Sequence, residues 1–299
     1  MTATEATPTP APVSSSRRQI RRPDHDALAR VVSSALAEDL VLGDPTTDGL
    51  FGIEATATMS LLVKEPGVVC GLPVVAAVLA ALSPDVVVTA SVADGDRVTD
   101  VPIEIARITG PTRAILSGER TALNLLGRLC GIATLTSRCV AELDGTGATL
   151  LDTRKTTAGL RDLEKYAVRC GGGTNHRLNL GEALLVKDNH LHLAGGIAAA
   201  VAALRHSAPR LRLEVEAETL DDVKVALDAG VNRILLDNMS LDEMRQAVAL
   251  VGGRVETEAS GGITLANLRA VGETGVDFVS LGALTHSARA LDVSLEVAG

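Results

Sequence analysis

Residues 211–238 read LRLEVEAETLDDVKVALDAGVNRILLDN. An apolar run at 211–215 stops at Glu216, a segment long enough for a helix follows, and a second apolar run at 233–236 stops at Asp237. Strands that alternate with helices in this way form parallel sheets. The stretch therefore predicts one strand, helix and strand unit of an α/β fold.

The same pattern extends through the second half of the chain. Apolar runs lie at residues 148–151, 183–186, 211–215, 233–236, 255–259 and 277–281, and each except the last is followed by a segment long enough for a helix. A closed α/β barrel has eight strands. We therefore expect an incomplete six-stranded α/β barrel, whose gap is covered by something else.

The first half of the chain is less regular. Apolar positions recur at helical spacing over residues 24–42, with Asp24 placed to cap the first turn. Further elements are expected as β-prone runs at 55–64, 86–90 and 103–109 and as helices near 73–82 and over 112–143. This mixture indicates an α+β domain that ends near residue 115 and is followed by the long helix.

Composition excludes several classes of protein. The chain has 299 residues, a net charge of -9, no Trp, one Tyr and two Phe, so it lacks both the basic surface and the stacking platforms of a nucleic-acid-binding protein. No run of eighteen apolar residues is present to span a membrane. Residues 1–23 are rich in Thr, Pro, Ser and Arg, and we expect a disordered tail there.

The four cysteines are widely spread and form no CxxC pair; they are Cys70, Cys130, Cys139 and Cys170. This spacing indicates neither a structural zinc site nor a disulfide framework. We interpret them as reduced cytosolic thiols.

Polar, charged or glycine residues follow every predicted strand of the second half. They are residues 152–155, 187–188, Glu216, 237–238, 260–262 and 282–283. In an α/β barrel the carboxyl ends of the strands share one face, and active sites are built on that face. The sequence therefore predicts a functional site at this end of the barrel.

Cations gather in one part of this acidic chain, and the cluster consists of Arg154, Lys155, His176, Arg177 and Lys187. Guanidinium and ammonium groups bind carboxylates and phosphates with charge-assisted hydrogen bonds, so the cluster predicts an anionic ligand. The alternative is that these are surface charges, each paired with Asp152, Glu164, Glu182 or Asp188. Their shared placement at strand ends or in one loop favours the ligand site.

Two carboxylates, Glu216 and Asp237, end neighbouring predicted strands opposite the cations. They are suited to accept hydrogen bonds from ribose, to hold magnesium, or to stabilise positive charge on a sugar carbon; solvated strand-end charges are the alternative. Gly261, Gly262 and Gly282 allow backbone N–H groups to approach a phosphate, with Thr264 expected to cap the next helix.

Two histidines and a helical charge pair remain ambiguous. His190 and His192 would fall on different faces of a helix, so we expect a core or supporting role for them and no metal. Glu119 and Arg120 lie on the long helix before the barrel, where they are equally explained as surface charges.

Several segments match a known family in order and spacing. Among them are ALAEDLVLGDPTTD (35–48), GERTALNLLGRLCGIAT (118–134), LDTRKTTAGLRDLEKYAVRCGGGTNHR (151–177), LLVKDNH (184–190), EASGGIT (258–264) and SLGALTHSARALDVSLE (280–296). Together they resemble the quinolinate phosphoribosyltransferases, also called nicotinate-nucleotide pyrophosphorylases (carboxylating). The resemblance implies an N-terminal α/β sandwich domain at 24–127, completed by 285–299, and an incomplete six-stranded α/β barrel at 128–284.

The resemblance also implies an activity. The family transfers phosphoribosyl from phosphoribosyl pyrophosphate to quinolinate and releases carbon dioxide and pyrophosphate, which gives nicotinate mononucleotide for de novo NAD synthesis. The implied quinolinate-binding residues are Thr153, Arg154, His176, Arg177 and Lys187, with Arg120 supplied by the partner subunit of a homodimer. Those implied for phosphoribosyl pyrophosphate are Lys155, Glu216 and Asp237, with Mg2+ held by the two carboxylates directly or through water. Phosphate is assigned to Ser260, Gly261, Gly262, Leu281, Gly282 and Ala283, and catalysis to Lys155, Lys187, Glu216 and Asp237.

Two residues depart from the family pattern: Ala158 stands where Pro is usual, and Cys130 where Ser is usual. Neither departure removes a charge.

The resemblance further implies a cytoplasmic enzyme that forms a dimer or a higher oligomer. Two alternatives remain, namely an aldolase-like barrel with a Schiff base on Lys155 or Lys187, and a non-catalytic or altered-specificity relative that binds anions or sugar phosphates.

Overall fold

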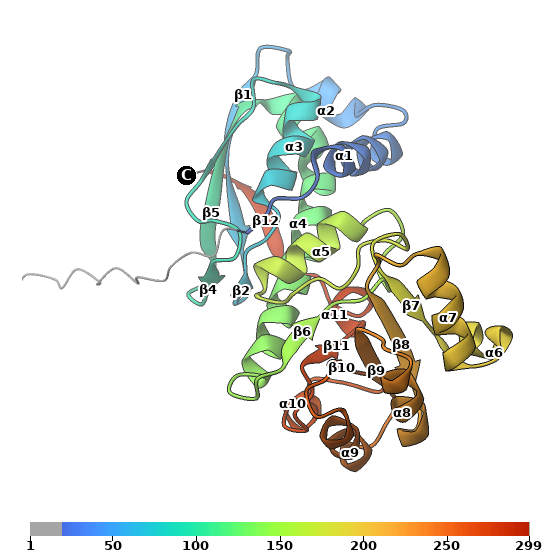
Figure 1. Ribbon diagram of the computed structural model, residues 1–299. Helices are drawn as coiled ribbons and strands as arrows, with labels where there is room; N and C mark the ends of the chain where they lie inside the picture. Colours follow the sequence, from blue (N-terminus) through green and yellow to red (C-terminus); the bar gives the residue numbers. More distant parts are fainter. Residues whose placement is uncertain (1–19, 299) are drawn as a thin grey trace, which may run out of the picture.

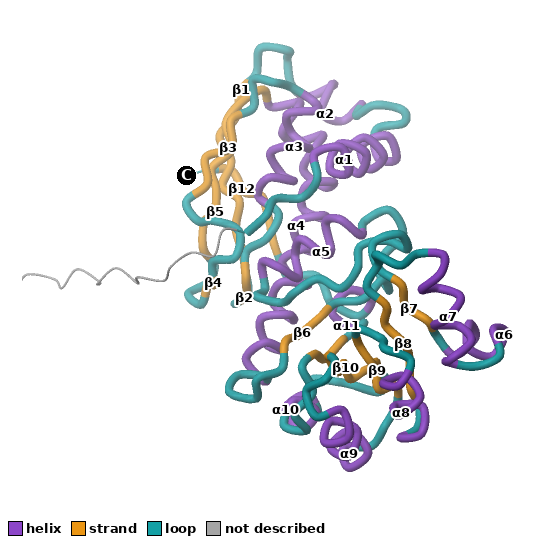
Figure 2. The backbone as a smooth tube through the Cα atoms, viewed as in Figure 1, coloured by secondary structure: helices purple, strands orange, loops and turns teal. Residues whose placement is uncertain are grey.

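The computed structural model describes residues 20–298 (Figure 1), so most of the predicted tail, residues 1–23, lies outside the described residues. The chain forms an upper layer of antiparallel strands with helices and a lower α/β barrel (Figure 2). In this range we find no helix whose length and apolar character suffice for a bilayer span.

The upper part contains a four-stranded antiparallel sheet in the order β12-β1-β5-β3. Its strands are β1 Thr56–Val63, β3 Val87–Ala90, β5 Ile103–Pro111 and β12 Val293–Val297. A small ribbon pairs β2 Gly67–Val68 with β4 Arg97–Val98. The helices α1 His25–Asp39, α2 Pro45–Leu50 and α3 Leu72–Leu82 lie on one side of the sheet (Figure 1). The predicted cap is confirmed, because the Asp24 side chain accepts a hydrogen bond from Ala27 N at 3.0 Å.

One helix, α4 Thr112–Glu142, joins the two parts and has 31 residues, close to the predicted 112–143. The returning C-terminal segment crosses it closely, because Leu291 N donates to Gly127 O at 2.9 Å. A Cβ atom at Gly131 would overlap the main-chain carbonyl of Arg289. Glycine at this position therefore allows the end of the chain to reach β1 and complete the upper sheet.

The lower part is a six-stranded parallel sheet in the order β6-β11-β10-β9-β8-β7, which confirms the predicted incomplete barrel. Its strands are β6 Thr149–Leu151, β7 Leu184–Val186, β8 Leu213–Ala217, β9 Arg233–Asp237, β10 Glu256–Ser260 and β11 Phe278–Ser280. Its helices are α5 Arg161–Cys170, α6 Asp188–Ala194, α7 Ile197–Ser207, α8 Leu220–Asp228, α9 Leu241–Val251, α10 Leu268–Gly272 and α11 Ala283–His286.

The free edge of β6 is lined by the segment that follows α5. Thr174 N donates to Leu150 O at 2.9 Å, and Asp152 N donates to Thr174 O at 3.2 Å. This segment lies where a further strand would continue the barrel, so it covers part of the predicted gap.

The predicted capping role of Thr264 is wrong. Thr264 N donates to the Asn267 side chain at 2.7 Å, which closes a turn, and α10 begins only at Leu268. Because a local side-chain bond competes with helix formation, the helix after β10 is delayed and has only 5 residues.

Candidate functional site

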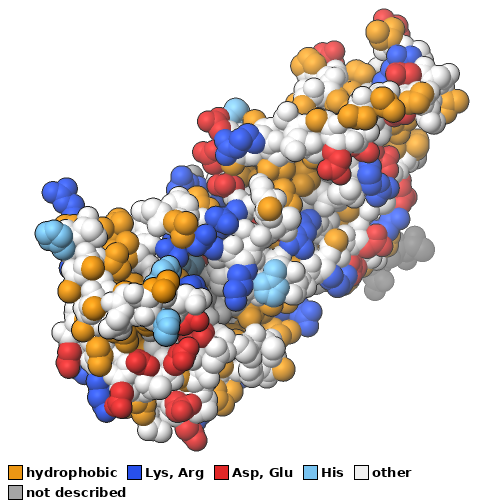
Figure 3. Space-filling model, turned by 90° about the vertical axis from the view of Figure 1, so that its right-hand side faces the viewer, with side chains coloured by type: hydrophobic (Ala, Val, Ile, Leu, Met, Phe, Trp, Pro, Cys, Tyr) orange, Lys and Arg blue, Asp and Glu red, His pale blue; other side chains and the backbone are white. Residues whose placement is uncertain are grey.

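The carboxyl ends of the six strands form the mouth of the barrel, and most predicted site residues lie there. Lys187 follows β7, Glu216 lies near the end of β8, Asp237 ends β9, Ser260 ends β10 and Gly282 follows β11. Asp237 and Ser260 are register partners on adjacent strands. One face of the molecule has a hollow bordered by Lys, Arg and His side chains, with Asp and Glu side chains at its lower edge (Figure 3).

Arg154 and Arg177 approach one another although they come from different segments. Burial lowers the pKa of Arg177, and the neighbouring positive charge of Arg154 lowers it further. Arg177 Nη1 donates to Ala183 O at 2.8 Å, whereas Arg154 Nε is buried without a hydrogen-bond partner. Two neighbouring guanidinium charges, one of which has an unpaired donor, are stabilised by an anion beside them.

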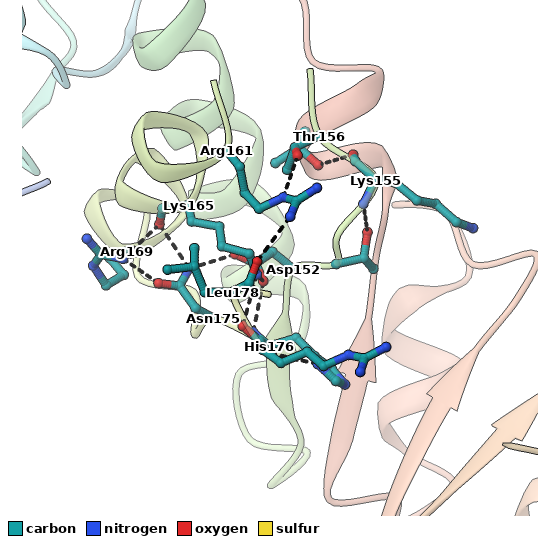
Figure 4. Close-up of polar contacts among 12 residues, drawn as sticks. Asp152, Lys155, Thr156, Arg161, Lys165, Arg169, Asn175, His176 and Leu178 are labelled. Atoms are coloured by element: carbon teal, nitrogen blue, oxygen red, sulfur yellow. Dashed lines mark hydrogen bonds and ion pairs between the residues drawn. The ribbon is translucent and has the colours of Figure 1, made fainter. Parts of the chain in front are cut away.

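Beneath these arginines lies a buried ion pair between Asp152 and Lys165, which are 0% and 1% exposed. The Asp152 carboxylate also accepts hydrogen bonds from His176 N at 2.8 Å and Asn175 Nδ2 at 2.6 Å. Figure 4 shows these side chains converging from β6, α5 and the loop after α5. Asp152 was considered above as a partner of surface charges; it is instead an internal anchor of the site.

The His176 ring points into the barrel. Its Nε2 lies 3.1 Å from Glu214 and 3.4 Å from Glu258, and the side chain is only 10% exposed. Burial lowers the pKa of His176, but these two carboxylates outweigh burial and raise the pKa to about 9. Against this, Nδ1 accepts a hydrogen bond from Arg177 N at 2.8 Å, which an imidazolium ring cannot do. With this bond in place the ring carries one proton, on Nε2, which faces Glu214 and Glu258.

Lys155 lies beside Gly282 and Thr285, after the last strand of the barrel. Its main chain is held by Thr285 Oγ1, which donates to Lys155 O at 2.7 Å, and by Thr153 Oγ1, which accepts from Lys155 N at 3.0 Å. The side chain is exposed, and its Cδ would lie 3.1 Å from a Cβ atom at Gly282. It points away from the Asp152 network (Figure 4) and toward the turn after β11.

Glu216 is 7% exposed, so it is not a solvated strand-end charge. One of its oxygens accepts from Asp188 N at 3.0 Å, and the other lies 3.5 Å from Lys187 Nζ. Asp237 is half-buried and accepts from Asn238 Nδ2 at 2.7 Å. A cavity of about 470 Å³ beside Glu216 is lined by acidic groups, which include Asp188 and Asp222.

These carboxylates fit magnesium, which prefers oxygen ligands. Within residues 20–298, Glu216 and Asp237 belong to no group of three clustered metal-ligating side chains. Two carboxylates alone leave most coordination positions to substrate phosphate and water, the arrangement that Mg2+ commonly has beside phosphorylated substrates.

The residues predicted for phosphate differ in what they can offer. Gly261 has a φ of +85°, and a Cβ atom there would overlap the Asn238 side chain, so glycine is required for this close approach. Gly262, with a φ of +62°, has open space around it. Leu281 N already donates to Leu151 O at 3.0 Å, so this N–H is not free for a phosphate. Ala283 begins the short helix α11 directly after Gly282.

Among the described residues, Arg120 makes no hydrogen bond or ion pair with the other predicted site residues. Arg120 is exposed on α4, eight residues before Arg128, which is about 12 Å along the helix axis. Arg128 itself lies at the junction of the two parts, where it pairs with the fully buried Glu164 at 2.8 Å and donates to Ala288 O at 2.9 Å. Glu164 was also considered as a surface partner, and the structure corrects that interpretation.

Several supporting residues were not singled out from the sequence. Lys165 had a detectable signal, because a lysine inside the run of buried residues 163–168 requires a partner. His190 is exposed and its Nδ1 accepts from Lys187 N at 3.0 Å, so it supports the start of α6 and lies outside the core.

The described cysteines are free thiols, and all four are buried. The ligand atoms of Cys70, Cys170 and Asp94 lie within 4.8 Å of one another, a proximity that spacing along the chain does not reveal. The Asp94 carboxylate already accepts from Gly71 N at 2.8 Å and from Tyr166 OH at 2.6 Å. Its oxygens therefore fix the start of α3 against α5.

Comparison with known proteins covers nearly the whole described chain. Residues 44–130 match the N-terminal domain profile of quinolinate phosphoribosyl transferase, and residues 132–296 match the C-terminal domain profile. The probable nicotinate-nucleotide pyrophosphorylase (carboxylating) of Bacillus subtilis is 41% identical over 275 residues, which are 92% of this chain and 94% of the relative. The nicotinate-nucleotide pyrophosphorylase (carboxylating) of Mycobacterium leprae is 40% identical over 285 residues, 92% of this chain and 98% of the relative.

Solved structures agree with these relatives. NadC from Streptococcus pyogenes superposes with a TM-score of 0.88 at 40% identity, over 92% of this chain and 98% of that chain. The nicotinate-nucleotide pyrophosphorylase from Francisella tularensis superposes with a TM-score of 0.89 at 38% identity, over 94% and 99%.

Proposed function

Because the chain belongs to the quinolinate phosphoribosyltransferase family, we propose that the mouth of its barrel binds quinolinate beside phosphoribosyl pyrophosphate. The enzyme transfers the phosphoribosyl group to quinolinate with decarboxylation, and it forms nicotinate mononucleotide, pyrophosphate and carbon dioxide in NAD biosynthesis. The assignment of individual residues to these two substrates is our proposal.

One observation carries the assignment: the charge of Arg154 is close enough to Arg177 to lower its pKa, and among the described residues Arg154 Nε is buried without a hydrogen-bond partner. Quinolinate has two adjacent carboxylates on a pyridine ring. A dianion satisfies both guanidinium groups, whereas a monoanion leaves one buried charge uncompensated. We assign Thr153 and Lys187 to the same ligand as further donors.

In the transfer step, the lone pair of the ring nitrogen forms a bond to C1 of the ribose, and the C1–oxygen bond breaks with its electrons leaving on pyrophosphate. Glu216 and Asp237 are placed to stabilise positive charge on the sugar, and Lys155 to offset the negative charge of the leaving group. Mg2+, when bound, supplies further charge neutralisation to the pyrophosphate.

Decarboxylation then needs no protein nucleophile. The bond between the ring and the adjacent carboxylate breaks, and its electron pair stays on the ring carbon beside the now positive nitrogen. A proton from water completes the product. The role of Arg154 and Arg177 in this step is to hold the other carboxylate in place.

We also assign Arg120 to the site of a partner subunit in a cytoplasmic homodimer or a higher oligomer. Its exposure on α4 supports this assignment, because an exposed arginine is available to a partner subunit.

A Schiff-base mechanism is disfavoured by the lysines. Lys155 is exposed and Lys187 is 47% exposed beside Glu216, whereas a Schiff-base lysine is usually desolvated in an apolar pocket or activated by a neighbouring cation.

The deciding experiment measures release of carbon dioxide and formation of nicotinate mononucleotide, with both substrates present and with each omitted. We expect release only when quinolinate and phosphoribosyl pyrophosphate are both present. Borohydride trapping with a carbonyl substrate would instead support the aldolase alternative, and stabilisation by ligands without turnover would support a non-catalytic relative.

A further inference from the structure

The main chain of His176 is held from both sides by one buried pair. Its N–H donates to Asp152 Oδ1 at 2.8 Å, and its C=O accepts from Lys165 Nζ at 2.9 Å. The next residue is Arg177, and Asp152 itself is two residues before Arg154. The pair therefore connects the backbone segments that carry the two adjacent arginines.

Helix α5 acts as a support for this loop. Arg161, Lys165 and Arg169 are spaced by four residues, so they lie on one face of the helix. Arg161 Nη1 donates to Leu178 O at 3.2 Å, and Arg169 Nη1 donates to Asn175 Oδ1. All three cations thus bind the segment 175–178 at successive points (Figure 4).

Burying a charged pair so completely is costly, and well-packed apolar residues of similar size often give equal or greater stability. Asp152 and Lys165 are 0% and 1% exposed, so neither side chain faces solvent in the mouth. What the pair provides, and an apolar pair cannot, is an acceptor for the N–H and a donor for the C=O of the same residue, His176.

We propose that Asp152 and Lys165 are positioning residues that fix the spacing between Arg154 and Arg177, and that they thereby set the preference for a ligand with two adjacent carboxylates. They do so without contacting the ligand. This inference rests on the proposed function, because it takes the paired arginines as the quinolinate site.

The test uses the full-length protein and binding calorimetry with three probes: benzene-1,2-dicarboxylate, benzoate and phosphoribosyl pyrophosphate. The double variant Asp152→Asn with Lys165→Met removes both charges together, so that no unpaired charge remains buried. Asn175→Ala keeps both charges of the pair and removes the amide side chain, with its hydrogen bonds to Asp152 Oδ2, to Lys165 O and from Arg169 Nη1, which provides a milder second variant. Folding is checked by circular dichroism and thermal melting.

We expect the folded variants to bind the dicarboxylate about tenfold or more weakly. Binding of phosphoribosyl pyrophosphate should change by less than about twofold, and the preference for dicarboxylate over benzoate should fall. A merely structural role would weaken all three probes together.

The matched control is Asp277→Asn. Asp277 also accepts from a main-chain N–H, that of Thr257 at 2.8 Å, but it lies before β11 at the opposite end of the barrel. The Asp277→Asn protein should bind all three probes with the same affinities as the wild type.

Two results would overturn the inference: folded variants that keep their dicarboxylate preference, or equal losses for all probes. Failure of the wild type itself to bind the dicarboxylate would instead reject the proposed function. Wild-type binding without turnover would reject the catalytic activity and leave the positioning role measurable.

Discussion

Lys187 Nζ lies 3.5 Å from Glu216 Oε1, so a cation assigned to quinolinate faces a carboxylate assigned to the sugar phosphate. Glu216 is nearly buried, whereas Lys187 is 47% exposed. The contact therefore places the two proposed subsites next to each other, as the transfer of a sugar onto a ring nitrogen requires.

Replacing Arg177 or Lys187 with alanine is expected to lower kcat/KM for quinolinate by about tenfold or more, because a hydrogen bond to a charged group contributes roughly 1.5 to 3 kcal/mol. Steady-state kinetics and thermal melting measure the two effects separately, and folding should be retained. Arg245→Ala is the control, since within residues 20–298 Arg245 pairs only with Asp242, on the same helix α9. Normal turnover in Arg177→Ala would remove this residue from the site.

Arg120→Ala and Lys187→Ala proteins should each be impaired, yet a mixture should regain part of the activity after subunit exchange. The reason is that a heterodimer of the two contains one site with both residues intact. Activity is measured before and after exchange, and exchange is verified by differently tagged subunits. If exchange is complete and no activity returns, the shared site is rejected.

Glu216→Gln should lower kcat by about a hundredfold and raise the magnesium concentration needed for half-maximal activity, because glutamine lacks the charge that faces the sugar and the metal. Gln retains an oxygen that can accept from Asp188 N, so folding should persist. Titration of magnesium at saturating substrates measures the effect. Glu273→Gln, which affects an exposed pair with Arg269, should behave as wild type.

Gly261→Ala should impair binding of phosphoribosyl pyrophosphate. The added Cβ atom would overlap Asn238 and so displace the turn after β9. Gly230→Ala separates this clash from simple backbone strain. Gly230 has a similar φ of +73°, but nothing lies within 4 Å of the new atom. Equal effects of the two substitutions on the substrate KM would argue against a special role for Gly261.

The pair of Glu65 and Arg289 should make stability depend on pH in the acid range. Arg289 holds the pKa of Glu65 below its ordinary value of 4.5, and Asp292 N donates to the same carboxylate at 2.8 Å. A lowered folded-state pKa gives stability that is complete above about pH 4.5 and is lost as the pH falls through the folded-state pKa.

Glu65→Gln should therefore lower the melting temperature by about 2 °C at pH 7, a modest effect because Arg289 is exposed. The difference between variant and wild type should shrink as the pH falls below about 4.5. A difference that is constant across this range would show that the charge of Glu65 is not responsible.

The sequence predicted the barrel well because the relevant signal is local. Each strand is a short apolar run, and the polar residue that ends it, such as Glu216 or Asp237, marks the mouth directly. Helix boundaries near turns were harder: Thr264 looked like a cap, but the Asn267 side chain binds its N–H first.

The sequence did not predict contacts between separate segments. Asp152 and Lys165 are thirteen residues apart, and only the packing of α5 against β6 and the following loop makes them partners. The sequence placed His176 in the cation cluster, and the direction of its ring depends on Glu214 and Glu258 from two further strands. Burial, unlike periodicity, is decided by the whole fold.

Strand β12 pairs with β1 from Met59 opposite Val297 to Val63 opposite Val293. During translation, one edge of the first sheet therefore stays without its hydrogen-bonding partner until residues 293–297 have left the ribosome. The sheet of the N-terminal half therefore lacks its last strand while the entire barrel is synthesised. The unpaired edge of β1 is then the part of the nascent chain that most needs protection from aggregation.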